Sequence, residues 1–182
     1  TIAKDVSMKG LGIHTGEPVS IRVLPAPADA GVVFVRTDLP HRPVIPATTA
    51  QVVDVGKPAR RTTLSKEGVE VQTVEHFMAA LWGAGIDNAY VEVTSAELPG
   101  LDGSALVFLQ QFQAAGATEQ EAPRRHFSLG EPVFVEDGDS SIVVFPSPTL
   151  RVSYLLSYDH PLLRSQFVSY ALNNGSSFTE TI

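Results

Sequence analysis

Cysteine is absent from the 182 residues of this chain. Its absence excludes disulfide bonds and thiolate metal ligands, so that only histidine, aspartate and glutamate remain to bind a metal. It also fits a reducing compartment, and we expect a cytoplasmic protein. No apolar run approaches the roughly 20 residues of a membrane span. No signal peptide is visible at the start, which is not a methionine. The sequence therefore predicts no transmembrane segment.

Positive charge is scarce: 13 Lys and Arg stand against 20 Asp and Glu, for a net charge of -7. This balance argues against a nucleic acid or an anionic membrane as a partner. Two basic pairs remain, Arg60-Arg61 and Arg124-Arg125, and either suits a phosphate, although such pairs are more often solvated surface. Hydrophobic residues make up 43% of the chain. That is enough to form the core of one large or two small domains.

A repeat at a constant offset of 121 residues organises the chain. Residues 21–40 read as a strand, a Pro-x-Pro break, a second strand and a turn with Asp and Pro, and residues 142–161 repeat this order. Helical patterns follow the first copy but not the second. Because a sheet needs helices to cover an apolar face, we expect a missing C-terminal part or a complementing chain. The alternative is a smaller second domain that is complete as it stands.

The element pattern predicts an α+β fold of two similar domains, each a sheet packed on helices, with the second incomplete. We place the first domain at residues 1–118, a polar linker at 119–126 and the start of the second domain at 127–182. The apolar stripe of the helix expected at 105–115 indicates core packing rather than a cofactor site. Alternating or β-branched patterns predict strands at 2–8, 18–24, 32–36, 88–94, 132–136, 141–145 and 150–156.

The segment Thr73-Val74-Glu75-His76 opens the other helical pattern, at residues 74–81. Thr73 suits the N-cap, where a hydroxyl accepts from a free backbone N–H. The positive end of the helix dipole stabilises Glu75 and favours a neutral His76. A neutral imidazole is a metal ligand, and a neighbouring carboxylate is suited to take a proton from water. The alternative is a common first-turn glutamate beside a packed histidine, because a short motif has a high false-positive rate.

A second cluster, Gly10-Leu11-Gly12-Ile13-His14-Thr15-Gly16, is rich in glycine. It is not a dinucleotide fingerprint, because no helix follows it, and it lacks the Gly-Lys-Ser/Thr of a P-loop. A turn is the simplest interpretation, with His14 either facing a site or filling the bend.

Three segments together resemble one family, the zinc-dependent UDP-3-O-acyl-N-acetylglucosamine deacetylases of lipid A synthesis. Residues 10–16 resemble the family's GxGLHTG segment, and residues 74–81 resemble its VEHLMAAL helix. Residues 101–105 resemble its MDGSA turn. Shorter matches at 85–88, 135–139 and 159–161 follow in order, so that the resemblance runs the length of the chain.

This resemblance implies two α+β domains of similar topology with the site between them. It implies a hydrolase that removes the N-acetyl group from a small-molecule substrate, the UDP-linked, 3-O-acylated amino sugar. His76 would then bind zinc and Glu75 would be the general base. The substrate would be contacted by His14, Arg61 and Tyr158.

The sequence departs from the family in one respect. Family members take two further zinc ligands from a His-x-x-x-Asp pair on a later helix, and a further His donates a proton to the leaving amine. No histidine here has an aspartate four residues on, and the sequence ends before the family's ARTF segment. We therefore expect these 182 residues alone to be inactive. A non-catalytic substrate-binding copy and a structural subunit that needs a partner chain stay open, and a His-x-x-x-Asp pair encoded downstream would favour the enzyme.

Overall fold

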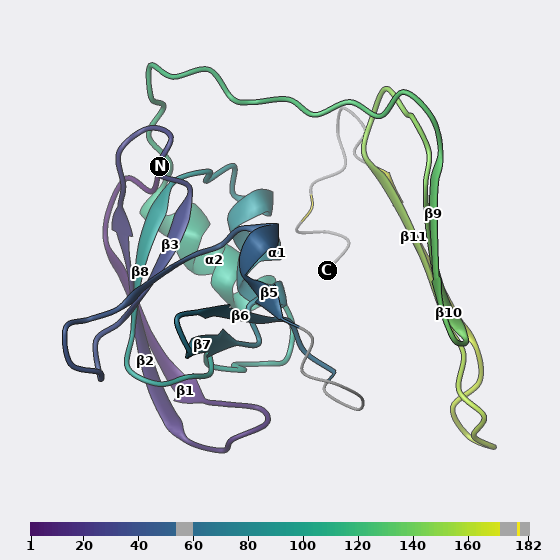
Figure 1. The fold of residues 1–182 in the computed structure, drawn as a ribbon, viewed down its shortest axis with the longest axis horizontal. Coiled ribbons are helices and arrows are strands. Elements are labelled where there is room, and N and C mark those ends of the chain that lie inside the picture. Colours follow the sequence, from purple (N-terminus) through teal and green to yellow (C-terminus); the bar gives the residue numbers. More distant parts are fainter. Residues whose placement is uncertain (54–59, 172–177, 179–182) are drawn as a thin grey trace. The chain divides into compact units, whose positions relative to one another are not determined.

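The computed structural model describes residues 1–53, 60–171 and 178. The chain forms two compact units, Thr1–Pro123 and Arg124–Thr181 (Figure 1). It passes from one unit to the other within the polar stretch at 119–126. The first unit contains the helices α1 (Glu75–Gly83) and α2 (Leu106–Ala115) together with two sheets. The predicted α+β class is confirmed.

A mixed five-stranded sheet forms the larger layer of the first unit. Its central strand, β8, runs antiparallel to β2 and parallel to β3, so that it joins two antiparallel hairpins into one sheet. In spatial order the strands are β1 (Val6–Leu11), β2 (Pro18–Pro25), β8 (Ala89–Val93), β3 (Val32–Arg36) and β4 (Val44–Pro46).

Both helices pack on one face of this sheet (Figure 1). Side chains alternate between buried and more exposed along β2, β3 and β8, as a sheet with one covered face requires. Phe77 of α1 lies at the centre of the core, with its ring centroid 5.5 Å from that of Phe108 and 5.4 Å from that of Phe112, both on α2. Phe34 of β3 lies 5.9 Å away on the sheet side. These fully buried rings fix the position of α1 on the sheet.

A smaller three-stranded sheet precedes α1 in the chain. It consists of β5 (Val52–Val53), β6 (Thr63–Lys66) and β7 (Val69–Gln72), and a 3₁₀ turn at Thr49–Gln51 leads into it. No periodic pattern in the sequence predicts these strands, because they are short and partly polar. Their importance lies in β7, which runs directly into the first turn of α1.

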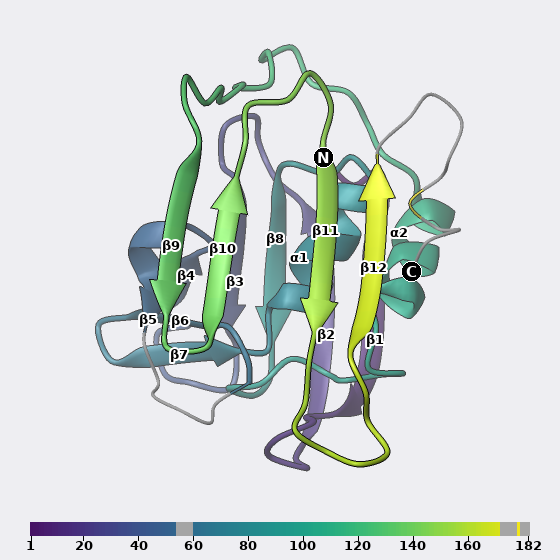
Figure 2. The same ribbon diagram turned by 90° about the vertical axis from the view of Figure 1, so that its right-hand side faces the viewer.

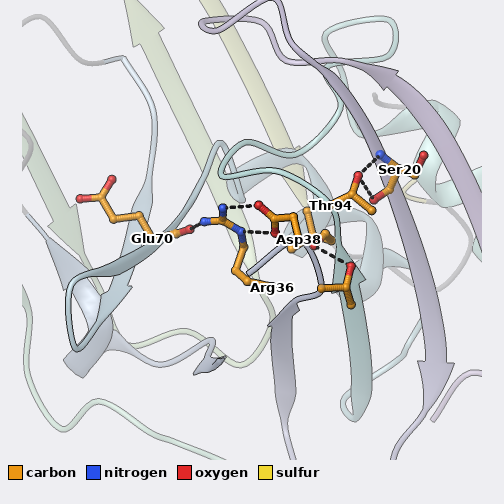
Figure 3. A network of polar contacts seen from close by, with 7 residues as sticks. Ser20, Arg36, Asp38, Glu70 and Thr94 are labelled. Carbon is orange, nitrogen blue, oxygen red and sulfur yellow. Dashed lines mark hydrogen bonds and ion pairs between the residues drawn. The ribbon is translucent and has the colours of Figure 1, made fainter. Parts of the chain in front are cut away.

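Arg36 ties the two sheets of the first unit together (Figure 3). This arginine ends β3 and is only 7% exposed. Its Nε and Nη2 donate to the two carboxylate oxygens of Asp38, at 2.9 and 2.7 Å, and its Nη1 donates to the Glu70 carbonyl of β7 at 2.7 Å. The hydrogen-bonded guanidinium of Arg36 keeps the pKa of Asp38 below its ordinary value. The strand that leads into α1 is thus fixed to the end of β3.

The second unit contains two antiparallel hairpins, shown in Figure 2. One pairs β9 (Val133–Asp137) with β10 (Ser140–Val144), and the other pairs β11 (Arg151–Leu156) with β12 (Gln166–Ala171). The strands of the sequence repeat hold equivalent places in both units: β2 and β10 close a first hairpin, and β3 and β11 open the next. Within the described part of this unit, no strand joins β10 to β11 as β8 joins β2 to β3.

Candidate active site

Glu75 and His76 begin α1, directly after the turn that leaves β7. The N–H groups of Thr73 and Val74 both donate to the carbonyl of Thr62, at 2.9 and 3.5 Å, and this pairing turns the chain into the helix. The prediction that Thr73 caps α1 is wrong: Val74 occupies the cap position, and no side chain bonds there. The Thr73 hydroxyl instead donates to the buried carboxylate of Glu97, because a buried anion requires donors.

The Glu75 carboxylate is held by the backbone beside an accessible imidazole. Its Oε2 accepts the Thr62 N–H at 3.0 Å, and its Oε1 lies 3.9 Å from Nε2 of His76. Both side chains are about one third exposed, at 35% for Glu75 and 34% for His76. The alternative that His76 is a packed core histidine does not fit this exposure. The pair presents a proton acceptor and a potential metal ligand to the same solvent-accessible region.

The Asp102 turn lies near this pair. Asp102 Oδ1 accepts the Ser104 N–H at 3.0 Å, and Oγ of Ser104 in turn accepts the Leu106 N–H at the start of α2. Hydrogen bonds from the Ser104 N–H and hydroxyl lower the pKa of the exposed Asp102 carboxyl, and the nearby His76 side chain acts in the same direction. The segment at 101–105 therefore starts α2 and adds a carboxylate to the electrostatic surroundings of His76.

The glycine-rich turn at residues 10–16 closes around Glu97. Oε1 of Glu97 accepts the His14 N–H at 2.9 Å, and Oε2 accepts the Thr15 N–H at 2.8 Å and the Thr15 hydroxyl at 2.7 Å. Gly12 makes this approach possible, because a Cβ there would lie only 2.2 Å from Glu97 Oε2. The His14 side chain is exposed. The turn is thus packed against a buried anion, with its histidine on the surface.

Glu97 itself is fully buried, and it is not among the site residues that the sequence predicts. It lies beyond β8, where the backbone of residues 96–98 bonds to Gln72 of β7. Burial alone would raise its pKa, but hydrogen bonds from His14, Thr15 and Thr73 lower the pKa to about 2. The sequence carries only a weak sign of this residue, a lone glutamate in the otherwise uncharged run Ser95-Ala96-Glu97-Leu98-Pro99-Gly100.

The other two predicted substrate contacts lie in different places. Arg61 directly precedes Thr62, the donor to Glu75, and its Nε is buried with no hydrogen-bond partner among the described residues. Tyr158 belongs to the second unit, two residues after β11, and is 37% exposed. Within the first unit, Arg61 is next to the residue that bonds Glu75, and the His14 turn is linked to Thr73 through Glu97. Tyr158 belongs to the second unit.

The described residues contain no group of three His, Asp or Glu side chains placed to hold a metal ion. A zinc site normally takes three protein ligands. His76 and its neighbouring carboxylates are suitable donors in kind, but they do not complete a site by themselves. In the same ranges, neither helix is long and apolar enough to cross a bilayer.

Comparison with known proteins assigns these features to a family. The family model of LpxC, UDP-3-O-acyl N-acetylglycosamine deacetylase, matches residues 1–182. The chain belongs to this family. The match includes the glycine-rich turn, the helix that carries Glu75 and His76, and the strands of the second unit.

Individual relatives agree with the family assignment. A protein from Saccharophagus degradans is 39% identical over 183 residues, and one from Pseudomonas entomophila is 40% identical over the same length. Each match covers 100% of this chain and 59% of the relative. A Myxococcus xanthus protein is 43% identical over 166 residues, which are 91% of this chain and 52% of the relative. All three are named UDP-3-O-acyl-N-acetylglucosamine deacetylase. The chain thus spans less than two thirds of the length of these relatives.

Proposed function

We propose that the protein carrying this chain is a zinc-dependent deacetylase. It would hydrolyse the N-acetyl group of UDP-3-O-acyl-N-acetylglucosamine in lipid A synthesis and act in the cytoplasm. The observation that carries this proposal is the pair of Glu75 and His76, one third exposed, with the Glu75 carboxylate held by the Thr62 N–H. Membership in the deacetylase family supports the reaction type.

In this proposal Glu75 is the general base. The Thr62 N–H occupies Oε2, which leaves Oε1 facing His76 and able to take a proton from the attacking water. His76 would be one zinc ligand, and the remaining ligands would come from outside the described residues. Bound zinc supplies Lewis-acid chemistry that activates water and polarises a carbonyl oxygen. Proton transfer from the water to Glu75 then accompanies attack on the acetamide carbon. The C–N bond breaks as the amine nitrogen takes a proton, returned by Glu75 or given by a donor outside the described residues.

Substrate contacts are proposed for three residues. The imidazole of His14 is exposed, and the backbone N–H of the same residue donates to the Glu97 carboxylate, which fixes the turn. Arg61 brings a guanidinium whose Nε lacks a partner in the described structure, which suits the diphosphate of a UDP group. Tyr158 would contribute from the second unit. No role for nucleic acid is proposed.

One observation favours a second candidate, a non-catalytic copy. Such a copy would bind substrate without hydrolysing it, or would be a structural subunit that needs a partner chain. The described residues provide His76 as a metal donor and contain no group of three metal ligands. The two candidates differ in metal stoichiometry: the enzyme holds one zinc per complete site, and the binding copy holds none tightly.

The test uses the intact protein that carries this chain. Release of acetate from the UDP-linked substrate is measured before and after chelation, and again after zinc is restored. The enzyme proposal expects activity that is lost on chelation and recovered with zinc, and a fall of at least about 100-fold in Glu75→Gln. Glu67→Gln, an exposed site in the β6–β7 turn, is the matched control and should keep full activity. Near-normal turnover in Glu75→Gln would refute the assignment of the base.

A further inference from the structure

Glu97 is a buried anion without a positively charged partner in the described structure. Its side chain is 0% exposed, and its four hydrogen bonds come from two backbone N–H groups and two hydroxyls. Burying a carboxylate is costly unless donors surround it, and charge-assisted bonds to an ionised acceptor hold those donors in a defined geometry. A buried carboxylate of this kind therefore fixes the segments that supply its donors.

The donors come from the two segments that carry the proposed site. Oε1 is shared by the His14 N–H and the Thr73 hydroxyl, at 2.9 and 3.0 Å, so that a single oxygen joins both segments. Thr73 lies two residues before Glu75 and has φ of 59°, in the left-handed region that a β-branched residue rarely adopts. Its bond to Glu97 stabilises this backbone at the entrance to α1.

The backbone around Glu97 is fixed as well. The Gln72 N–H donates to the Ala96 carbonyl at 2.7 Å, and the Leu98 N–H donates to the Gln72 carbonyl at 3.1 Å. Gly12 lies against the carboxylate so closely that no side chain fits between them. The segment that carries Glu97 is thus bridged through its backbone to Gln72 at the end of β7.

We propose that Glu97 is a positioning residue that sets the place of the His14 turn relative to Glu75 and His76. The inference rests on the proposed function, in which His14 contacts substrate and the α1 pair carries out the chemistry. Glu97 does not touch substrate: it acts through the His14 backbone on one side and through Thr73 on the other. Loss of its charge should therefore weaken substrate binding more than the chemical step.

Glu97→Gln in the intact protein tests this directly. The amide keeps the size of the side chain, but its NH₂ group faces donors and cannot accept from them. We expect faster hydrogen exchange in a peptide covering residues 12–17, a KM raised about tenfold, and kcat changed by less than about threefold. Metal content should match that of the unsubstituted protein. Glu92→Gln, on the neighbouring β8 and paired with Arg42 and Arg22, is the matched control and should change none of these.

A double-mutant cycle separates positioning from a general loss of structure. His14→Ala removes the imidazole but keeps the backbone N–H that Glu97 accepts. If Glu97 acts through His14, adding Glu97→Gln to His14→Ala raises KM by much less than it does alone. Additive effects on KM, or unchanged exchange at residues 12–17 in Glu97→Gln, would overturn the inference.

Two further measurements cover the cases in which Glu97→Gln does not fold or the intact protein has no deacetylase activity. If Glu97→Gln does not fold, Thr15→Val removes one of the four bonds, and a KM raised about threefold is expected, again non-additive with His14→Ala. An unchanged KM in Thr15→Val would contradict the proposal. If the intact protein shows no deacetylase activity, the proposed function fails, and the exchange rates at residues 12–17 alone decide whether Glu97 holds the turn.

Discussion

The backbone N–H of Thr62 donates to Oε2 of Glu75 at 3.0 Å, so the candidate base is held by the segment just before β6. The same residue accepts the N–H of Thr73 through its carbonyl. One peptide segment thus both turns the chain into α1 and orients the first side chain of that helix. The orientation of Glu75 depends on the small sheet as much as on the helix.

Shortening the base tests this arrangement. Glu75→Asp removes one methylene, so the carboxylate cannot keep the Thr62 bond and also reach the attacking water. We expect kcat of the intact protein to fall about 100-fold, because a misplacement of about 1 Å is enough for such a loss. Single-turnover acetate release measures the effect, with metal content as the control. An Asp variant that keeps most of the activity would show that the Thr62 bond does not position the base.

Arg36 should contribute measurably to the stability of the first unit. Arg36→Ala leaves the Glu70 carbonyl without its donor and Asp38 without its partner, and we expect a loss of about 2 kcal/mol in the free energy of unfolding. Arg36→Lys should recover only part, because an ammonium cannot form the paired bonds to Asp38. Urea unfolding provides the measurement. Arg22→Ala is the control, since its pair with Asp5 is half exposed, and an equal loss there would argue against a special role for Arg36.

Glu97 should make the protein sensitive to acid. Its folded pKa of about 2 lies below the ordinary value of 4.5, so its contribution to stability is complete above pH 4.5 and is lost as pH falls towards 2. The shift corresponds to about 3 kcal/mol at neutral pH. The difference in unfolding free energy between the unsubstituted chain and Glu97→Gln should therefore be largest near pH 7 and shrink steadily below pH 4.5. A difference independent of pH would mean that the ionised carboxylate is not the source.

Gly12→Ala should disrupt the glycine-rich turn by steric overlap alone. The new Cβ would lie 2.2 Å from Glu97 Oε2 and 2.3 Å from Thr15 Oγ1, so either the turn or the buried carboxylate must move. We expect a loss of about 2 kcal/mol in stability, within the usual range for an overpacked site. Thermal unfolding checks this, with Gly130→Ala as the control, because nothing lies within 4 Å of a Cβ there. Equal melting temperatures for the two variants would exclude a close approach at Gly12.

Local sequence patterns predicted much of the first unit. The strand expected at 32–36 forms at those residues, and the helices expected at 74–81 and 105–115 form within two residues of their predicted ends. The first strand was placed too early, at 2–8 instead of Val6–Leu11. The strands β4 to β7 and β12 were missed, because they are short or partly polar and their pairing, rather than a periodicity of their own, defines them.

The candidate site divides in the same way. The adjacency of Glu75 and His76 at a helix start follows from the sequence, since neighbouring residues in a first turn remain neighbours in space. The sequence predicts Thr73 as the helix cap, which is wrong, because helix-capping preference describes only partners close along the chain. Its true partner, Glu97, lies 24 residues away along the chain, and the His14 N–H reaches the same carboxylate from 83 residues away.

The sequence by itself determined the α+β class, the repeated strands and the glutamate–histidine pair, because each depends on periodicity or on adjacency along the chain. Only the tertiary structure decided what holds these parts in place: the Thr62 N–H on Glu75, the Glu70 carbonyl on Arg36, and the four donors around Glu97. These contacts join distant segments whose meeting is set by the packing of two helices on a mixed sheet. No local pattern records them, because a hydrogen bond depends on where two groups lie in space and not on their separation along the chain.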